Sequence, residues 1–480
     1  VWGTLARLSY LQQPDAMGAH LNPWVFHSAN IAVHVVSVLL VYAILQKLIR
    51  DKRASCIGAM LFALHPLQVE SVAWCAGMKD VLGGMLGLLA IWQYLTFVRD
   101  SGPNRRWHYV AASTAFVLGM LAKPSVMVVP IMVGAIDLIL LRRSFRTVLP
   151  ALAPWLLLAI ACAIGAKIAQ PAYGVTAAPL WARPLIAADS LAFYLYKLVW
   201  PVSLGIDYGR RPDVLIERGW IYLTWIVPVA LAAWLMLNRR RTPELLVAGI
   251  ILVAGVAPVL GLSTFLFQHF STTTDHYLYL AMLGPALAAA WLVNRYPAPR
   301  TVAVAAVVLV MLGIRTIFQT RVWQNDIALF SHALAVNPES SMAMSNLGHV
   351  YATQNDLDRA QPLFEKALRM YPDYYEAHVG LANVLVARGQ LDQAITHRMA
   401  ALNVMARRPP QIRADITPLV NALSRDLIDA GRLGEARQFL GTIRQDDPET
   451  IENLKLLDEK MKHAATQPGG GAAGTTAPKP

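Results

Sequence analysis

Residues 301–319 read TVAVAAVVLVMLGIRTIFQ, an apolar run in which Arg315 is the only charged residue. A helix of this length can cross a bilayer, because a hydrocarbon core of about 30 Å takes roughly 20 helical residues. The chain changes character directly after this run: residues 1–325 hold 26 Lys or Arg and 12 Asp or Glu, whereas residues 326–480 hold 16 and 18. The run therefore predicts a boundary near Arg321 between a basic membrane part and a polar part.

The composition of the whole chain is that of an integral membrane protein. Of its 480 residues, 56% are hydrophobic and 15% are charged, whereas soluble domains are about one quarter charged. The formal net charge of +12 comes from the membrane part, so we expect a lipid bilayer as partner and no nucleic acid. The three cysteines predict neither a disulfide framework nor a zinc site. Apolar stretches predict ten spans, near residues 31–49, 54–68, 80–98, 107–122, 124–141, 148–168, 219–237, 244–262, 276–293 and 301–319.

Basic loops predict the orientation of these spans, because cytoplasmic loops are enriched in Lys and Arg. Residues 183–204 are then expected to form an interfacial or re-entrant helix on the outer face, since a span there would invert the later loops. Asp189 and Lys197 within it are also costly in hydrocarbon. The chain starts at Val1 without an initiator Met, which predicts a further helix and outer loop upstream. The cytoplasmic side is assigned by 14 of the 26 cations, in loops 50–53, 99–106, 142–146, 238–241 and 294–300.

The polar part contains an internal repeat of 34 residues. Small residues at fixed positions let paired helices approach, so this pattern predicts tetratricopeptide repeats that stack into an α-solenoid. The repeated positions are Leu347, Gly348, Tyr351, Ala360, Phe364, Ala367 and Pro372, which recur as Leu381, Ala382, Leu385, Ala394, Arg398, Ala401 and Ala406. We predict an all-α chain with a polytopic membrane module at 1–322 and a repeat domain at 323–463. Its parts are a half repeat at 326–340, repeats at 341–374, 375–408 and 417–450, a capping helix near Lys455–Lys462, and a disordered tail at 464–480.

One boundary between spans concentrates ionisable groups. A predicted span ends at His65-Pro66, Glu70 and Trp74 follow in an amphipathic segment, and Lys79-Asp80 begins the next span. Ionisable groups at a membrane boundary are functional candidates by default.

These motifs resemble a known family. His65-Pro66 through Trp74 with Lys79-Asp80, together with the later motifs, is similar to the transmembrane and tetratricopeptide-repeat O-mannosyltransferase-like proteins, whose bacterial members combine the same two halves. The resemblance extends over nearly the whole chain, and its motifs occur in the same order. The further motifs are His27-Ser28-Ala29-Asn30, Ala122-Lys123-Pro124 with Asp137, Tyr194 to Pro201 with Asp207-Tyr208, Tyr277 to Leu280, and Trp323 to Pro338.

The resemblance implies a GT-C-like membrane module. Such enzymes take a sugar, here a mannose-like hexose, from a polyprenyl-phosphate carrier and transfer it to a hydroxyl acceptor on the outer side. Asp80 resembles the second acidic position of the GT-C module, which binds a metal or positions the acceptor, and is our candidate catalytic carboxylate. The base itself is expected in the upstream loop, and Mg²⁺ or Mn²⁺ is the candidate cofactor, with no metal ligands assigned.

The remaining candidates divide by charge. Lys79, Lys123, Arg210 and Arg211 are expected to bind the donor phosphate, where arginines form bidentate bonds. The residues expected to line the site are His27, Asn30, His65, Glu70, Asp207, Asp275 and His276. The catalytic and phosphate-binding candidates also have structural alternatives. Asp80 complements a helix dipole, Lys79 and Lys123 anchor helices at the headgroups, and Arg210 and Arg211 lie in a solvated loop. The family usually has Arg where this chain has His276, and His is mostly uncharged at neutral pH.

Three functions remain open from the sequence. The first is a glycosyltransferase of the bacterial inner membrane, with its site and repeats on the periplasmic side and the repeats recruiting a protein or glycan acceptor. The second is a non-catalytic membrane-anchored repeat scaffold for envelope protein assembly. The third is an O-antigen ligase or polymerase, for which the outer loop Ser263–Asp275 is short.

Overall fold

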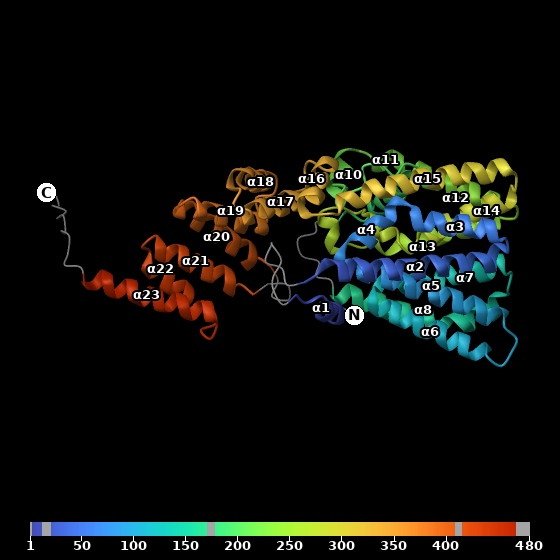
Figure 1. Cartoon of the computed structure of the whole chain (residues 1–480), viewed down its shortest axis with the longest axis horizontal. Helices are drawn as coiled ribbons and strands as arrows, with labels where there is room; N and C mark the ends of the chain where they lie inside the picture. The colour runs from blue at the N-terminus through green and yellow to red at the C-terminus, as the bar shows by residue number, and fades with distance from the viewer. Residues whose placement is uncertain (1, 12–20, 170–177, 409–414, 467–480) are drawn as a thin grey trace. The chain divides into compact units, whose positions relative to one another are not determined.

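The structure is a computed structural model that describes residues 2–11, 21–169, 178–408 and 415–466 (Figure 1). In these ranges the chain forms helices and no β-strand beyond an isolated bridge between Tyr10 and Leu21. The predicted all-α fold class is therefore confirmed. The chain folds as two compact units, Val1–Pro338 and Glu339–Pro480.

Local sequence signals start and stop the first long helices of unit 1. Helix α2 (Pro23–Ile49) begins after Asn22, whose side chain accepts a hydrogen bond from Trp24 N at 3.0 Å, and it ends at Arg50, which is left-handed with φ 64°. Helix α3 (Lys52–Leu64) is capped by Asp51, which accepts from Ala54 N at 2.7 Å. Asx side chains satisfy amides that the first turn of a helix leaves free.

The other helices of unit 1 follow in chain order. They are α1 (Trp2–Ser9), η1 (Pro66–Gln68), α4 (Val69–Ala73), η2 (Cys75–Gly77), α5 (Met78–Arg99), α6 (Arg105–Ala122), η3 (Pro124–Val128), α7 (Val129–Ala135), the π-helical η4 (Ile136–Leu140), α8 (Phe145–Ala169), α9 (Arg183–Val199), α10 (Pro212–Glu217), α11 (Ile221–Thr224), α12 (Ile226–Leu237), α13 (Pro243–Val256), η5 (Ala257–Val259), η6 (Leu266–His269), η7 (Asp275–Leu278), α14 (Leu283–Arg295), α15 (Pro299–Val322) and α16 (Asp326–Val336).

Fewer helices than predicted have the length and composition of a complete span. Among the described residues four qualify, Pro23–Ile49, Cys75–Arg99, Phe145–Ala169 and Pro299–Val322. The pair α3 and η1–α4 is bent by 51° and makes a fifth if it counts as one broken span. Helices lie at all ten predicted ranges, and several of these apolar helices are shorter than 18 residues. Examples are Pro124–Leu140, Ile221–Leu237 and Pro243–Val259. The number of spans that cross the membrane therefore stays a prediction.

The connections of unit 1 separate by charge. Figure 1 shows the α2–α3, α5–α6 and α14–α15 connections together at one end of the unit, on the right, and α10 at the other end. The three connections include the predicted basic loops 50–53, 99–106 and 294–300. The unit therefore has a basic end and an opposite end, which we call the polar end, where α4 and the loop before α10 lie.

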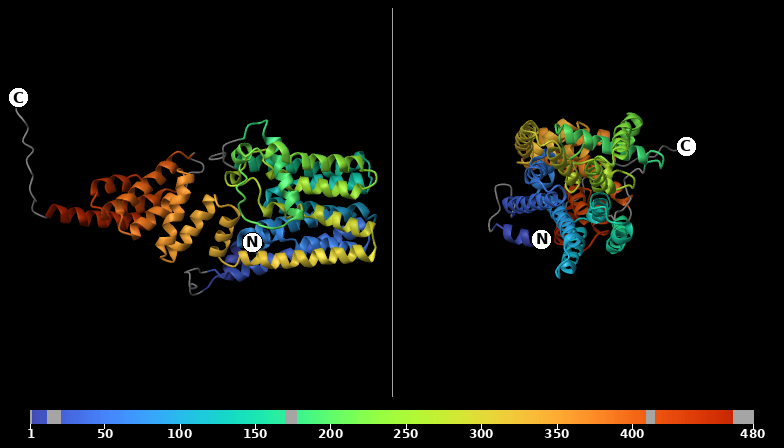
Figure 2. Two further views of the ribbon diagram at one scale, coloured as in Figure 1. Left: turned by 90° about the horizontal axis from the view of Figure 1, so that it is seen from above. Right: turned by 90° about the vertical axis from the view of Figure 1, so that its right-hand side faces the viewer.

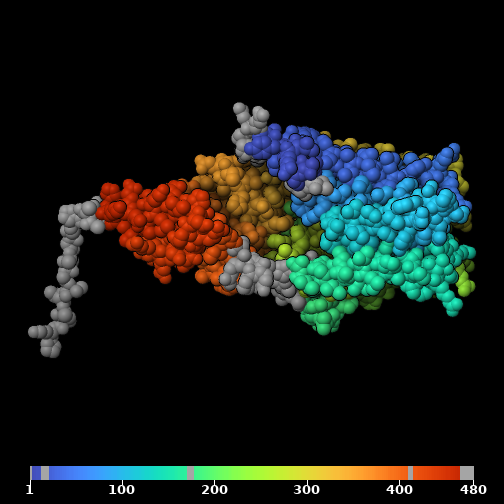
Figure 3. Space-filling view, turned by 90° about the horizontal axis from the view of Figure 1, so that it is seen from below, coloured from blue at the N-terminus to red at the C-terminus, as the bar shows by residue number. Residues whose placement is uncertain are grey.

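Neighbouring helices of unit 1 pack through aromatic side chains and at glycines. Figure 3 shows α6 and α8 side by side on one face of unit 1. Tyr109 Oη donates to Ala151 O at 2.7 Å, and Trp155 Nε1 donates to Ser113 Oγ at 2.9 Å. On α5, a Cβ added at Gly84 would overlap the ring of Tyr279. This glycine therefore lets the segment around η7 lie directly on α5.

The second unit contains helix pairs in the order expected for the repeats. The helices are α17 (Ser341–Thr353), α18 (Leu357–Met370), α19 (Tyr375–Ala387), α20 (Leu391–Ala406), α21 (Thr417–Asp429), α22 (Leu433–Leu440) and α23 (Pro448–Thr466). Figure 2 shows them, coloured from orange to red, stacked one after another. The ring of Phe364 packs against Gly348 and Gly380. These two glycines therefore leave room for a ring that contacts two successive helix pairs. The predicted capping helix lies within α23, and residues 467–480 of the predicted tail lie outside the described residues.

Helix α16 of the predicted half repeat belongs by its contacts to unit 1. His332 Nε2 bonds Leu204 O at 2.8 Å, and Asn337 Nδ2 donates to Asp207 Oδ2 at 3.2 Å. This helix therefore packs on the loop that follows α9.

Candidate active site at the polar end

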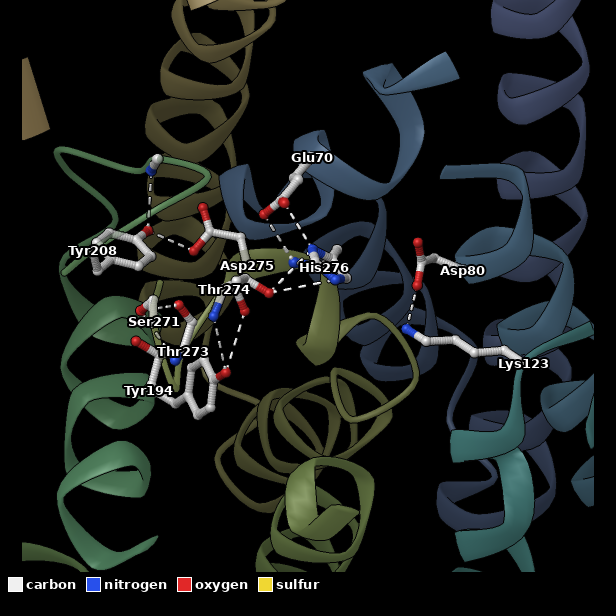
Figure 4. Close-up of polar contacts among 11 residues, drawn as sticks. Glu70, Asp80, Lys123, Tyr194, Tyr208, Ser271, Thr273, Thr274, Asp275 and His276 are labelled. Atoms are coloured by element: carbon white, nitrogen blue, oxygen red, sulfur yellow. Dashed lines mark hydrogen bonds and ion pairs between the residues drawn. The ribbon is translucent and has the colours of Figure 1, made fainter. Parts of the chain in front are cut away.

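Segments far apart in the sequence meet at the polar end. Figure 4 shows Glu70 from α4, Asp80 from α5, Lys123 after α6, Tyr194 from α9, Tyr208 from the following loop, and Ser271, Thr273, Thr274, Asp275 and His276 around the start of η7. The run from Ser271 to His276 is buried throughout, although it consists of polar residues. Polar groups enclosed in this way require hydrogen-bond partners. The residues at the start of η7 lie at the centre of the resulting network.

Glu70 and His276 form the central contact. Glu70 Oε1 lies 2.7 Å from His276 Nδ1, and Glu70 Oε2 accepts a hydrogen bond from His276 N at 3.1 Å. One carboxyl group thus holds both the ring and the backbone of His276. The hydroxyl of Thr274 lies 3.1 Å from the same Nδ1. His276 therefore gives Glu70 a partner in its ring and another in its backbone amide.

Two tyrosines fix the residues beside this pair. Tyr208 Oη donates to Asp275 Oδ1 at 2.6 Å and accepts from Gly205 N at 3.2 Å. Tyr194 Oη donates to Thr274 O and accepts from Thr274 N, both at 3.3 Å. These bonds tie α9 and the loop after it to η7.

Asp80 and Lys123 form an ion pair at the edge of this network. The side chain of Asp80 is fully buried, whereas that of Lys123 is 18% exposed. Only Oδ1 of Asp80 contacts Lys123, and Oδ2 is buried without a hydrogen-bond partner. The second lysine, Lys79, is exposed and lies 5.3 Å from the ring centre of Trp74, and that ring lies 6.0 Å from the ring of His276. Asp80, Lys79 and Lys123 are all within electrostatic range of His276.

The two arginines already have carboxylate partners. Arg210 pairs with the buried Asp189 at 2.5 Å and lies between the rings of Phe193 and Trp220, 4.6 and 4.9 Å from their centres. Arg211 pairs with Asp213 at 2.5 Å, near the surface. Arg210 O also accepts from Thr272 N at 3.0 Å, which joins the loop after α9 to the loop before η7. Arg210 is thus in a position to hold two loops together.

The other predicted residues make contacts nearby. Asn30 Nδ2 donates to Val72 O and Trp74 O at 3.1 and 2.9 Å, and His27 Nε2 lies 3.4 Å from Cys75 Sγ. Both anchor the segment between α4 and α5 to α2. His65 Nε2 bonds Leu198 O at 3.1 Å. Asp207 Oδ1 accepts from Gly209 N at 2.8 Å.

Sequence reasoning missed several residues of this network, namely Gln68, Ser71, Tyr194, Lys197, Tyr208 and Thr274. Gln68 and Ser71 are buried with side-chain atoms that have no partner. Lys197 Nζ donates to Val202 O and Ser203 O at 2.6 and 3.1 Å, which explains how a lysine is tolerated within α9. A signal existed for Tyr194, Lys197 and Tyr208, because they lie in motifs that carry the family resemblance, and Lys197 is also a cation inside an apolar run.

The described side chains offer no metal site with three or more protein ligands at the polar end. In the ranges that the structure describes, no group of three or more His, Cys, Asp or Glu residues could hold a metal ion. The Mg²⁺ or Mn²⁺ cofactor stays a prediction, and no step below involves it.

Comparisons with known proteins agree with the motifs in both parts of the chain. Residues 17–165 match the family described as dolichyl-phosphate-mannose-protein mannosyltransferase, and residues 352–403 match the tetratricopeptide repeat. The chain is 22% identical to protein O-mannosyl-transferase TMTC3 of Mus musculus over 90% of this chain and 51% of that protein. It is 26% identical to protein O-mannosyl-transferase Tmtc2 of Drosophila melanogaster over 42% of this chain and 23% of that protein.

The chain spans about half the length of the curated relatives it covers most fully. Among solved structures, yeast Tom70 covers 92% of this chain and 98% of its own at 12% identity, with a TM-score of 0.21 that is too low to support a shared arrangement. The sequence matches include a mannosyltransferase family in the membrane part and a repeat family in the polar part. The chain is therefore similar to protein O-mannosyl-transferases over most of its length, and its second part is similar to tetratricopeptide-repeat proteins.

Proposed function

We propose that this protein transfers a mannose-like hexose from a polyprenyl-phosphate carrier to a hydroxyl group of a protein acceptor, at the polar end of unit 1. The observation that carries the proposal is the Asp80–Lys123 pair. Oδ2 of Asp80 is buried and has no hydrogen-bond partner. An unmet buried acceptor costs about 1–3 kcal/mol, and a catalytic role is one of the explanations for such a group.

The pair suits the two ends of a glycosyl transfer. Oδ2 of Asp80 accepts a hydrogen bond from the acceptor hydroxyl and orients it towards the anomeric carbon. The acceptor oxygen forms a bond to that carbon as the bond from the carbon to the phosphate oxygen breaks. The electron pair of the broken bond leaves with the carrier phosphate, and a carboxylate base takes up the proton of the acceptor hydroxyl. Lys123 and the exposed Lys79 supply positive charge for this phosphate, which is the kind of electrostatic stabilisation that contributes most to many enzymes.

An aromatic surface lies beside the pair. Trp74 is partly exposed, and Lys79 lies over its ring. We assign the ring of Trp74 to the face of the hexose and the repeats of unit 2 to recruitment of the acceptor, because solenoids offer extended binding surfaces. The proposed location is the bacterial inner membrane, with the polar end and the repeats on the periplasmic side.

The test uses the full-length protein in membranes with polyprenyl-phosphate [³H]mannose, and measures label incorporated into protein. Asp80→Asn should lower the rate at least about a hundredfold, a typical loss for a group that orients or moves a proton. Asp100→Asn is the matched control, because Asp100 lies at the basic end, and its rate should stay unchanged. Equal rates for the two variants would refute the role of Asp80.

A second function, a non-catalytic scaffold, is favoured by one observation. Arg210 and Arg211 are both occupied by carboxylates of this chain, so neither is free for a phosphate without rearrangement. A full-length protein that transfers no sugar from the carrier, but whose removal disrupts assembly of envelope proteins, would establish this alternative.

A further inference from the structure

Unit 2 contains a close pair of histidines from two successive helices. His378 on α19 and His397 on α20 approach with their Nδ1 atoms 3.0 Å apart, and their ring centres are separated by 5.3 Å. His378 is buried, whereas His397 is partly exposed. The pair is unrelated to the polar end of unit 1 and plays no part in the proposed transfer.

The hydrogen bonds fix which nitrogen of His378 carries a proton. His378 Nε2 lies 2.8 Å from Pro372 O, and a carbonyl oxygen only accepts, so Nε2 is the donor. In a neutral imidazole the other nitrogen is then an acceptor. The lone pair of His378 Nδ1 therefore points at His397, whose Nδ1 donates to it.

The bond from His378 Nε2 to Pro372 O is the kind of outer contact that a metal-binding histidine makes. A ligating histidine donates its other ring N–H to a carbonyl or carboxylate, which fixes its tautomer and orientation. Nitrogens about 2.0–2.1 Å from one ion lie about 2.9 Å apart at a right angle and about 3.4 Å apart at a tetrahedral angle. The observed separation of 3.0 Å falls between these values.

Space for further ligands lies next to the pair. A cavity of about 320 Å³ is lined by His397 together with Gln361, Glu365, Arg369 and Gln393. Because no third His, Cys, Asp or Glu of the described chain completes a cluster, water or an external ligand fills the remaining positions.

We propose that His378 and His397 form a two-histidine site for a divalent transition-metal ion on unit 2. Imidazole suits Cu²⁺, Ni²⁺ and Zn²⁺, and affinity within this series is highest for Cu²⁺. On binding, His397 carries its proton on Nε2 instead of Nδ1. Both Nδ1 lone pairs then coordinate the ion, and no net proton is released.

The test titrates the full-length protein in detergent with Cu²⁺ alone, by isothermal titration calorimetry and electron paramagnetic resonance. The unchanged protein should bind one ion per chain, with the spectral splitting of two imidazole nitrogens. His378→Gln and His397→Gln should each weaken binding at least about tenfold. His349→Gln is the matched control within the repeats, and Cys75→Ser tests the thiol that lies near His27; both should bind as the unchanged protein does.

Three results would overturn the site. They are a spectrum without two nitrogen ligands, equal affinity in the unchanged protein and both histidine variants, and a loss of binding confined to Cys75→Ser. Thermal unfolding of each variant separates a lost ligand from a lost fold. The spectrum of the unchanged protein decides the question even if a variant does not fold.

Discussion

Removal of Arg398 should destabilise unit 2 by about 3–4 kcal/mol at neutral pH. In the repeat pattern Arg398 occupies the position that Phe364 fills one repeat earlier. Its guanidinium pairs with Asp426 of α21 and donates to Asn383 Oδ1 at 3.1 Å. The side chains of the pair are only 7% and 5% exposed. Loss of one partner from a buried pair costs about 3–5 kcal/mol, because the other charge stays buried.

Protonation of Asp426 sets an upper limit to this cost. Burial raises the pKa of Asp426, and the Arg398 charge opposes the rise. In Arg398→Ala the carboxyl group of Asp426 can take up a proton. Protonation of this group costs about 1.36 kcal/mol for each unit by which the pH exceeds the pKa of about 3.9 that an Asp has in the unfolded chain. The limit is thus about 4 kcal/mol at pH 7 and about 1.5 kcal/mol at pH 5. A folded pKa above the unfolded value means that stability is lost as pH rises, so the variant should recover at low pH.

The measurement is urea unfolding of the full-length protein, followed by hydrogen exchange of amides in α20 and α21. Arg407→Ala is the control, because its pair with Asp373 is 63% and 72% exposed, and exposed pairs contribute at most about 1 kcal/mol. Replacing both Arg398 and Asp426 with Leu should restore most of the loss. A loss below about 1 kcal/mol at pH 7, or one that does not shrink towards pH 5, would refute the reasoning.

Three further predictions concern single contacts. Tyr208→Phe removes the hydrogen bond to Asp275 and should lower the stability of unit 1 by about 1–3 kcal/mol, measured as a lower melting temperature in detergent; an unchanged melting temperature would contradict it. Gly84→Ala should destabilise unit 1 by about 1–3 kcal/mol, since its methyl group meets the ring of Tyr279 and overpacking carries a cost of this size; wild-type stability would show that the helices move apart freely. Burial lowers the pKa of His349, so unit 2 should lose stability as pH falls below about 6.5, where the unfolded histidine binds more protons; His349→Gln should lose this part of the pH dependence, and an identical pH profile would exclude it.

The fold could be predicted where one segment alone carries the information. Asn22 before Pro23 and Asp51 before α3 are helix starts that short-range chemistry determines. The repeat period of 34 residues is likewise visible without a structure. The number of spans stays a prediction, because hydropathy does not distinguish a helix that crosses lipid from a shorter one enclosed by its neighbours.

The site could be predicted only as separate motifs. Lys79-Asp80 and His276 stood out by charge and position, but the contact between Glu70 and His276 joins positions 206 residues apart. The partner of Asp275, Tyr208, precedes it by 67 residues and carries no charge. Arg398 looked like a weak match to an aromatic position, and its partner Asp426 lies one repeat later. Long-range pairing of this kind depends on tertiary packing, which one sequence without relatives does not reveal.

The unequal lengths of α14 and α15 have a consequence for how a donor reaches the polar end. The two helices start from a common connection (Figure 1) and contain 13 and 24 residues, which correspond to about 20 and 36 Å. The end of α14 next to η7 therefore lies about 16 Å short of the far end of α15. The difference is taken up by residues 271–282, which include the buried polar run from Ser271 to His276 beside Glu70. A donor that reaches His276 and Glu70 therefore meets polar groups that are enclosed by the surrounding helices.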